Sequence, residues 1–212
     1  MTDKNLHTKI FTDIYNSKKW GSVPNQAYFS GGGSLLHNCQ YWFDFLVKFF
    51  NNNNISSIVD GGCGDFVVSN YLLDILNKDG LTIEYTGYEC FEGLVKQHNK
   101  NHPNIDIQYL DIHSQKHLMK EADCLLLKEV LQHWENKQLL EFINYIKKSK
   151  TYKYIITANS FVTDSHQDWL DCDYEKKQTG RALNCKLEPM KGLGFISKGL
   201  FNNKTEIGVL TV

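Results

Sequence analysis

The sequence predicts one α/β domain, a three-layer sandwich in which helices cover both faces of a seven-stranded, mostly parallel sheet. From residue 55 to residue 158, short apolar runs alternate with helical segments, which is typical of parallel strands joined by helical crossovers. Residues 195–212 read as two strands with no helix between them, so they should pair as an antiparallel hairpin at the sheet edge. With 42% hydrophobic residues in a chain of 212, there is enough apolar material for one core.

Two helices are expected before the sheet. Residues 4–18 place apolar side chains four residues apart, which predicts an amphipathic helix. Residues 35–50 are strongly apolar and predict a second helix, and the asparagine run at residues 51–54 reads as the loop that ends it. The side chains of the second helix that should pack on the core are Trp42, Phe45, Leu46 and Phe49.

Strands and helices are expected to alternate through the sheet region. The strands are predicted at residues 55–60, 83–89, 105–110, 123–128 and 152–158. The helices between them are predicted at residues 66–78, 91–101 and 114–120, and from a cap at Asn136 to the lysines at 147–150. Asp79-Gly80 is a typical helix end, a helix stops before Pro103, and lysines favour the negative end of a helix dipole.

Composition bears on the partners and on the compartment. The chain has 23 basic and 24 acidic side chains, and its net charge of −1 gives no general attraction for nucleic acid or anionic lipid. Its six cysteines are scattered without a C-x-x-C pair, so neither a metal site nor a disulfide framework is expected. No apolar run approaches about 18 residues and no signal peptide is apparent. We therefore expect a soluble, cytoplasmic protein, in the host cytoplasm if the chain is viral.

A glycine-rich turn follows the first predicted strand. The segment reads Asp60-Gly61-Gly62-Cys63-Gly64, and its glycines let a ligand approach the backbone closely. The dinucleotide fingerprint G-x-G-x-x-G/A fails, because its third position is Val67. An acidic residue before the glycines would repel a pyrophosphate, so Asp60 disfavours NAD and favours a ligand with a cationic part. S-adenosylmethionine (SAM), which carries an ammonium and a sulfonium group, is such a ligand.

These residues resemble the first motif, D/E-x-G-x-G-x, of the class I SAM-dependent methyltransferases, whose fold is Rossmann-like. Three further features fall at strand ends where that family has them: Tyr88-Glu89, Leu110-Asp111-Ile112, and the segment from Lys128 to Trp134. The resemblance implies that Glu89 binds the ribose hydroxyls, that Asp111 lies at the adenine amino group, and that the last segment closes the cofactor pocket. The cofactor-binding residues that it implies are Asp60, Gly61, Gly62, Cys63, Gly64, Glu89, Cys90, Asp111, Ile112 and Lys128.

Other interpretations of the carboxylates stay open. Glu89 could be a solvated carboxylate at a strand end, and Asp111 could cap the helix that follows it. Asp60 and the glycines could form a plain strand-to-helix turn in another α/β fold.

The motifs D-x-G-C-G-D-W and K-D/E-V-L-Q-H-W are similar to those of a bacterial and viral subfamily of small stand-alone methyltransferases, although this chain has Phe66 in place of the first tryptophan. Members also have an S-G-x-G-S loop, here at residues 30–34, and a segment G-x-R-P-L-D-L-x-x-P-P-F, here at residues 180–190 with Ala182 and Asn184 replacing proline and aspartate. We expect three parts within the single domain 1–212. They are N-terminal helices that form a cofactor and substrate lid (1–50), the cofactor-binding core (51–160), and a substrate loop with the terminal hairpin (161–212).

His133 is the candidate general base. It follows the fourth strand, where the acceptor should face the methyl group, and an imidazole with an unperturbed pKa of about 6.5 can remove a proton from a hydroxyl. It could instead pack in the core or bind the substrate.

Arg181 is the only arginine of the chain. Its planar fork could clamp a carboxylate or phosphate of the substrate, form an ion pair with Asp171, Asp173 or Glu129, or stand alone at the surface. The polar segment 164–169, with His166 and Asp168, is more typical of a surface loop than of an acceptor site. The substrate-binding candidates are Trp134, Asn159 and Arg181.

The predicted function is methyl transfer from SAM to an oxygen of a small polar molecule, such as a sugar or a glycan precursor. The sugar is suggested by aromatic side chains that could stack on its ring, Trp20, Tyr28, Trp134 and Trp169. A protein or nucleic-acid methyltransferase is an alternative, although the net charge and the lack of an N-P-P-Y or D-P-P-Y motif disfavour nucleic acid. A non-catalytic, cofactor-binding scaffold subunit is another. The expected partner is thus a small-molecule acceptor, with no membrane, and the oligomeric state stays open.

Overall fold

The computed structural model describes residues 6–163, 180–201 and 204–212. It contains two compact units, Met1–Met119 and Lys120–Val212, which are described one at a time. The predicted segment 164–169 and the proposed ion-pair partners Asp171 and Asp173 lie outside the described residues.

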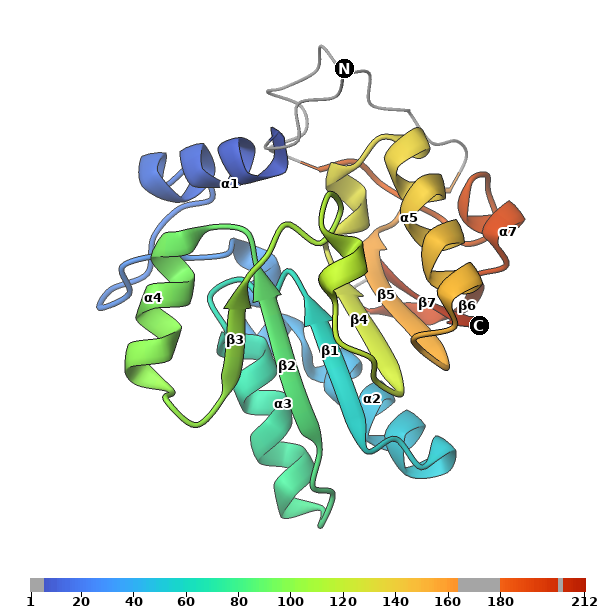
Figure 1. Cartoon of the computed structure of the whole chain (residues 1–212), viewed down its shortest axis with the longest axis horizontal. Helices are drawn as coiled ribbons and strands as arrows, with labels where there is room; N and C mark the ends of the chain where they lie inside the picture. Colours follow the sequence, from blue (N-terminus) through green and yellow to red (C-terminus); the bar gives the residue numbers. More distant parts are fainter. Residues whose placement is uncertain (1–5, 164–179, 202–203) are drawn as a thin grey trace. The chain divides into compact units, whose positions relative to one another are not determined.

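The first unit is built on three parallel strands. They are β1 (Ser57–Gly61), β2 (Glu84–Glu89) and β3 (Asp106–Tyr109), in the order β3-β2-β1 (Figure 1). The crossovers between them are α3 (Val67–Lys78) and α4 (Glu92–Asn101), close to the predicted bounds. The register pairs Gly61 with Tyr88 and Glu89 with Tyr109, so the three carboxyl ends lie side by side.

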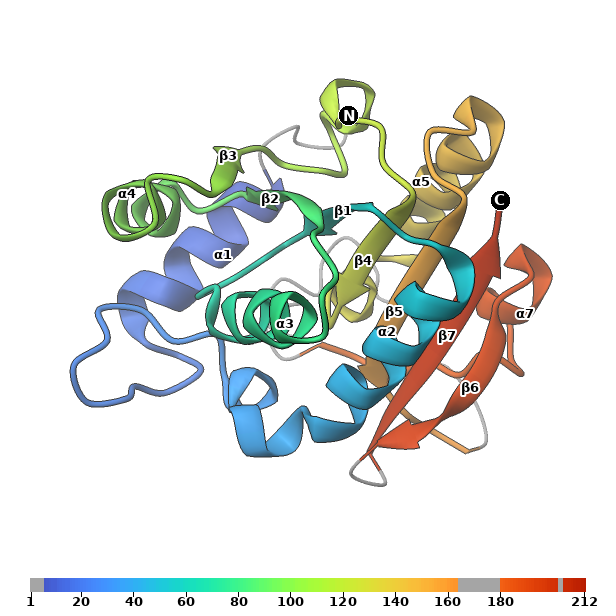
Figure 2. The ribbon, with the colours of Figure 1, turned by 90° about the horizontal axis from the view of Figure 1, so that it is seen from below.

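Two helices precede these strands, as predicted, but the second begins later than expected. They are α1 (Leu6–Ser17) and α2 (Gln40–Asn53), and Figure 2 shows both from a second direction. Two short 3-10 turns, η1 (Gly32–Ser34) and η2 (Leu36–Asn38), occupy the stretch before α2. In place of the helix predicted at residues 114–120, the structure has only a third 3-10 turn, η3 (Lys116–Leu118).

The asparagine run is helical, not the loop that the sequence predicted. The side-chain amides of Asn51 and Asn53 donate to the carbonyls of Val47 and Phe49, one turn back, at 3.1 and 2.8 Å. Only Asn54 leaves the helix, in the left-handed conformation with φ 51° that commonly ends helices.

The buried face of α2 is also shifted from the prediction. Its buried side chains are Trp42, Phe43, Leu46 and Phe50. Phe43 is buried because its ring packs on Tyr71 of α3, with 5.0 Å between the centroids. The prediction was therefore wrong for Phe45 and Phe49, which are only half-buried.

The second unit adds four strands in the order β4-β5-β7-β6. Strands β4 (Cys124–Lys128) and β5 (Tyr154–Ser160) are parallel, and β6 (Ile196–Phe201) with β7 (Thr205–Thr211) forms the predicted antiparallel hairpin. Helix α5 (Asn136–Ser149), the 3-10 turn η4 (Leu131–His133) and the short α7 (Met190–Leu193) complete the unit. Seven strands, mostly parallel and with an antiparallel C-terminal hairpin, confirm the predicted fold class.

One helix cap differs from the prediction. Glu135, not Asn136, caps α5. The backbone N–H of Glu135 donates to Gln138 Oε1 at 3.1 Å, and the Glu135 side chain accepts from the backbone N–H of Gln138. This reciprocal capping box satisfies two N–H groups at the helix start.

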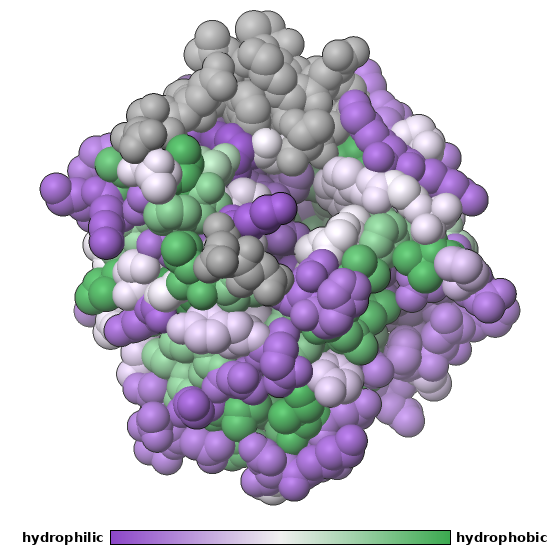
Figure 3. Space-filling model, turned by 180° about the vertical axis from the view of Figure 1, so that it is seen from behind, coloured by the Kyte–Doolittle hydropathy of each residue, from purple (hydrophilic) through white to green (hydrophobic). Residues whose placement is uncertain are grey.

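Figure 3 shows one face, on which hydrophobic residues form separate patches among hydrophilic ones. Within the described residues, no helix combines the length and the apolar character that crossing a membrane requires.

Candidate functional site

The glycine turn after β1 is fixed to the end of β2. The backbone N–H groups of Gly62 and Cys63 both donate to the carbonyl of Tyr88, at 2.8 and 3.0 Å. Gly62 and Gly64 have φ values of 82° and 58°, in the region that favours glycine. The Cys63 side chain is buried against β2, where a Cβ added at Gly87 would lie 3.2 Å from its sulfur.

Gly64 has no room for a side chain. A Cβ placed there would lie 2.6 Å from the hydroxyl oxygen of Ser30. Ser30 approaches closely because it exchanges hydrogen bonds with Asp65: its hydroxyl accepts from the Asp65 N–H at 2.7 Å, and its own N–H donates to Asp65 Oδ2 at 2.9 Å. Ser34 adds a third bond, from its hydroxyl to the same carboxylate oxygen at 3.1 Å. The segment at residues 30–34 is therefore a clamp on the glycine turn.

Sequence reasoning missed the role of Asp65. Its position after Gly64 was visible in the motif, but its partners are about 35 residues away, so no local pattern could have identified them.

Helix α1 reaches the same turn through Tyr15. Its hydroxyl lies 2.9 Å from that of Ser30, and its ring stacks on Phe91 with 5.1 Å between the centroids. Burial, with a further contribution from Glu89, raises the pKa of the Tyr15 phenol well above its usual value, so it stays neutral. Trp20 and Tyr28 pack around this aromatic cluster, and a stacking role for them toward a sugar stays a prediction.

Replacing Ser30 with alanine is expected to lower the free energy of unfolding by about 1–3 kcal/mol. The reason is that the partly buried Asp65 N–H and the Tyr15 hydroxyl would lose their shared partner. Urea unfolding measures this. Ser17→Ala is the control, because that hydroxyl only bonds to carbonyls of its own helix, and it should change stability by less than about 0.5 kcal/mol. Equal effects of the two substitutions would contradict the clamp.

Glu89 is the carboxylate at the carboxyl end of β2, and it is 4% exposed. Its Oε2 accepts from the N–H of Gly64 at 3.1 Å and its Oε1 from the N–H of Phe91 at 3.0 Å. Burial raises its pKa to about 6, and these backbone donors oppose part of that rise. Cys90 also hydrogen-bonds to this carboxylate, through its backbone and its side chain, so a ligand hydroxyl bound there would share or replace one of these donors. The alternative of a solvated strand-end carboxylate is wrong for Glu89. The adjacent Cys90 is half-buried.

Two further side chains hold the turn from its other sides. His98 of α4 is buried and lies 2.8 Å from the Gly64 carbonyl through Nε2, so this nitrogen carries the donated proton. Burial lowers the pKa of His98, which favours the neutral ring. Asp60 Oδ2 accepts from the hydroxyls of Ser69 and Tyr85, at 2.5 and 2.9 Å. A role for Asp60 toward a cationic ligand stays a prediction.

Asp111 closes a local turn after β3 and does not cap η3, whose N-cap residue is Gln115 and has no side-chain cap bond. Its Oδ1 accepts from the N–H of His113 at 3.0 Å, its Oδ2 accepts from Ser114 Oγ at 2.9 Å, and His7 Nδ1 of α1 lies 3.5 Å from Oδ1. Burial would raise the pKa of this carboxyl, but His7 and the two donors outweigh it, and the pKa is lowered. The neighbouring Ile112 is buried, and binding of an adenine by this pair stays a prediction.

In the second unit, the end of β4 has a strained backbone. Glu129 has φ 57°, and its N–H donates to the carbonyl of Ala158 on β5 at 2.6 Å. Its carboxylate lies 3.6 Å from Lys128 Nζ. His133 ends η4 and is 5% exposed, and Trp134 is a core side chain whose ring packs on Phe142 with 5.0 Å between the centroids. Base catalysis by His133 stays a prediction.

Gln132 joins three segments of the second unit, a role that sequence reasoning missed. Its Oε1 accepts from the N–H of Ser160, and its carbonyl accepts from the N–H of Arg181, both at 2.9 Å. The N–H of Leu183 donates to the carbonyl of Ser160 at 2.6 Å. These bonds hold Arg181 at the end of β5, where it is only 4% exposed, so the interpretation of Arg181 as a lone surface charge is wrong. Asn159, which directly precedes Ser160 in the sequence, is also buried.

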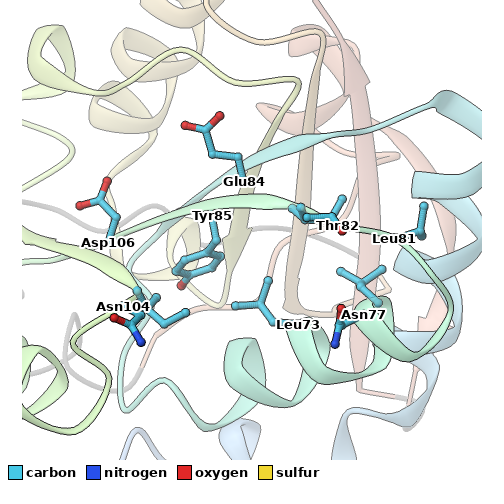
Figure 4. A pocket seen from close by; sticks show the side chains of 11 residues that line it. Leu73, Asn77, Leu81, Thr82, Glu84, Tyr85, Asn104 and Asp106 are labelled. Carbon is cyan, nitrogen blue, oxygen red and sulfur yellow. The ribbon is translucent and has the colours of Figure 1, made fainter.

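A pocket of about 370 Å³ lies in the first unit where β2 and β3 begin, at the end of these strands opposite to Glu89 (Figure 4). It is lined by Glu84 and Asp106, which begin β2 and β3, and by Leu73 of α3. The Asp106 carboxylate is already bonded, to Thr86 Oγ1 at 3.0 Å and to Gln108 Nε2 at 2.9 Å. Open parallel sheets bind ligands at the carboxyl ends of their strands, so this pocket is not part of the candidate site.

No family model matches the sequence, and no curated protein matches it either. Solved structures do. Magnesium protoporphyrin IX methyltransferase (ChlM) from Synechocystis PCC 6803 with bound SAM is 15% identical, with a TM-score of 0.57 over 99% of this chain and 97% of that one. The PH0226 protein of Pyrococcus horikoshii OT3 is 14% identical, with a TM-score of 0.60 over 94% and 95%. The methyltransferase domain of bacterial CtHen1-CN is 15% identical, with a TM-score of 0.56 over 82% and 100%. The chain is similar to these structures in its fold.

Proposed function

We propose that the chain is a SAM-dependent methyltransferase whose first unit binds the cofactor. The observation that carries the proposal is Glu89: a buried carboxylate at the end of β2, held beside the glycine turn by the N–H groups of Gly64 and Phe91. Two adjacent ribose hydroxyls are the ligand groups that suit it. The likeness in fold to ChlM with bound SAM supports the choice of cofactor.

The residues present fit this cofactor. Gly64 lets Ser30 pack directly against the turn, since a Cβ there would lie 2.6 Å from the Ser30 hydroxyl oxygen, and this holds the Gly64 N–H beside Glu89. Glu89 would hold the ribose, and Asp111 with Ile112 would lie at the adenine side. When bound, SAM supplies an electrophilic methyl group on a sulfonium. The task of the chain is then to position the acceptor in line with that methyl group and to exclude water.

For the acceptor we propose a small polar molecule with a hydroxyl group, such as a sugar or a glycan precursor, and a location in the cytoplasm. A hydroxyl oxygen must lose its proton as the methyl group arrives, and His133 would accept that proton. Buried polar side chains at the end of β5 support a polar acceptor, since Gln132, Asn159 and Arg181 are all less than 10% exposed.

Transfer of label from tritiated SAM tests the proposal. Purified protein is incubated with the small-molecule fraction, the protein fraction and the nucleic-acid fraction of a cell extract. Label should enter the small molecules, and His133→Ala should slow this by about 10²- to 10⁴-fold. Label in protein or nucleic acid would instead support the alternative acceptors. SAM binding without transfer to any fraction would support a scaffold subunit.

A further inference from the structure

Asn159 has a buried side-chain oxygen to which nothing in the described part of the second unit donates a hydrogen bond. It lies near the end of β5 and is 3% exposed, and its Oδ1 has no hydrogen-bond partner within the described residues. Buried side-chain amides are nearly always hydrogen-bonded, because an unmade bond leaves the cost of desolvation uncompensated. Such an amide therefore needs an explanation.

A second asparagine of the same unit shows what a structural amide looks like. Asn184 is also 3% exposed, but both ends of its amide are bonded. Its Nδ2 donates to the carbonyl of Val162 at 2.7 Å, and its Oδ1 accepts from the N–H of Lys186 at 2.8 Å. Burial alone does not prevent this chain from satisfying an asparagine.

Glu206 lies next to Asn159 on the same face of the sheet. The two residues are direct partners in the antiparallel register of β5 and β7, and side chains of direct partners are neighbours. Glu206 is 4% exposed, and its Oε2 accepts from the N–H of Cys185 at 2.6 Å. The Glu206 carboxyl group is thereby fixed beside Asn159.

We propose that Asn159, with Glu206 beside it, binds a hydroxyl group of the acceptor; this inference rests on the proposed function and names the chemistry of its acceptor site. An amide both donates and accepts hydrogen bonds, and the neighbouring carboxyl group offers acceptor oxygens. A hydroxyl can match both, because it donates one hydrogen bond and accepts others. A carboxylate or phosphate fits less well, because it has no hydrogen to donate to the neighbouring Glu206 carboxyl group. Asn159 is thus a specificity-determining residue for hydroxylated acceptors.

Three variants test this through two readouts, the melting temperature of the unliganded protein and the label transferred from tritiated SAM to the small-molecule fraction of a cell extract. Asn159→Leu keeps the approximate shape of the side chain and removes the unpartnered Oδ1, so it should raise Tm by about 2–4 °C. The same variant should lower transfer at least about tenfold and leave the affinity for SAM within about twofold of the original. A stability gain paired with a loss of function is what a binding residue gives, and a structural residue does not.

The controls separate strand and packing effects from binding. Asn184→Leu breaks two made bonds and should lower Tm. Thr157→Val removes another hydroxyl of β5 that has no partner within the described residues and is fully buried, so it should raise Tm and leave transfer unchanged. A fall in Tm for Asn159→Leu, or unchanged transfer, would overturn the inference. Absence of SAM binding by the unaltered protein would overturn the proposed function instead, and the Tm comparison would still stand.

Discussion

Replacing Gly64 with alanine is expected to lower the affinity for SAM at least about tenfold. The new Cβ would lie 2.6 Å from Ser30 Oγ, and the φ of 58° is strained for any residue with a side chain. To relieve the contact, the turn and Ser30 must move apart, which disturbs the hydrogen bonds between Ser30 and Asp65. Such a movement would also displace the Gly64 N–H from Glu89, so the ribose site and the turn would be lost together.

Gly80→Ala is the matched control for this variant. Gly80 also has a positive φ, 79°, but a Cβ there would meet nothing within 4 Å. The control should therefore show the backbone strain as a loss of stability of about 1–2 kcal/mol, with unchanged affinity for SAM. Calorimetry and urea unfolding of both variants measure the two effects. If Gly64→Ala binds SAM as well as Gly80→Ala does, the turn is not the cofactor site.

Replacing Glu89 with glutamine is expected to weaken SAM binding by about 10- to 100-fold. Hydrogen bonds to a charged group contribute about 1.5–3 kcal/mol, and the neutral amide offers one acceptor oxygen where the carboxylate offers two. One of the two backbone donors, from Gly64 or Phe91, would also face an NH₂ group.

The pKa of Glu89 gives the same prediction a pH dependence. Because the pKa is about 6 in the folded chain against 4.5 ordinarily, SAM affinity should be constant above about pH 7 and fall as pH drops through 6.

The free energy of unfolding should respond to pH in the opposite direction. The protonated carboxyl is favoured by burial, so its contribution is fully present below 4.5 and is lost as pH rises through 6. Calorimetric titrations and thermal melts from about pH 8 to about pH 5 test both, and Glu89→Gln should remove both dependences. A wild-type affinity that is flat across this range would contradict the assignment of Glu89.

Much of the fold could be predicted because its signals are local. The strands, the crossover helices and the C-terminal hairpin follow from apolar periods and from short turn motifs, each within about a dozen residues. The failures have physical causes as well. The asparagine run was expected to be a loop, since asparagine favours turns, yet Asn51 and Asn53 bond back to helix carbonyls and stay helical.

The candidate site was predictable in its motif and not in its supports. The glycine turn and Glu89 were identified because their spacing along the chain is itself the signal. The Ser30–Asp65 clamp and the link from Gln132 to Ser160 join residues about 30 positions apart. Local sequence patterns cannot predict contacts between residues so far apart in the chain. The sequence also could not distinguish an exposed arginine from a buried one, and Arg181 is buried.

Titration of the unaltered protein with SAM in a calorimeter tests the central claim most directly. We expect one site with a dissociation constant in the micromolar range, competition by S-adenosylhomocysteine, and no heat from NAD. Absence of SAM binding at millimolar ligand, or binding of NAD in its place, would contradict the account.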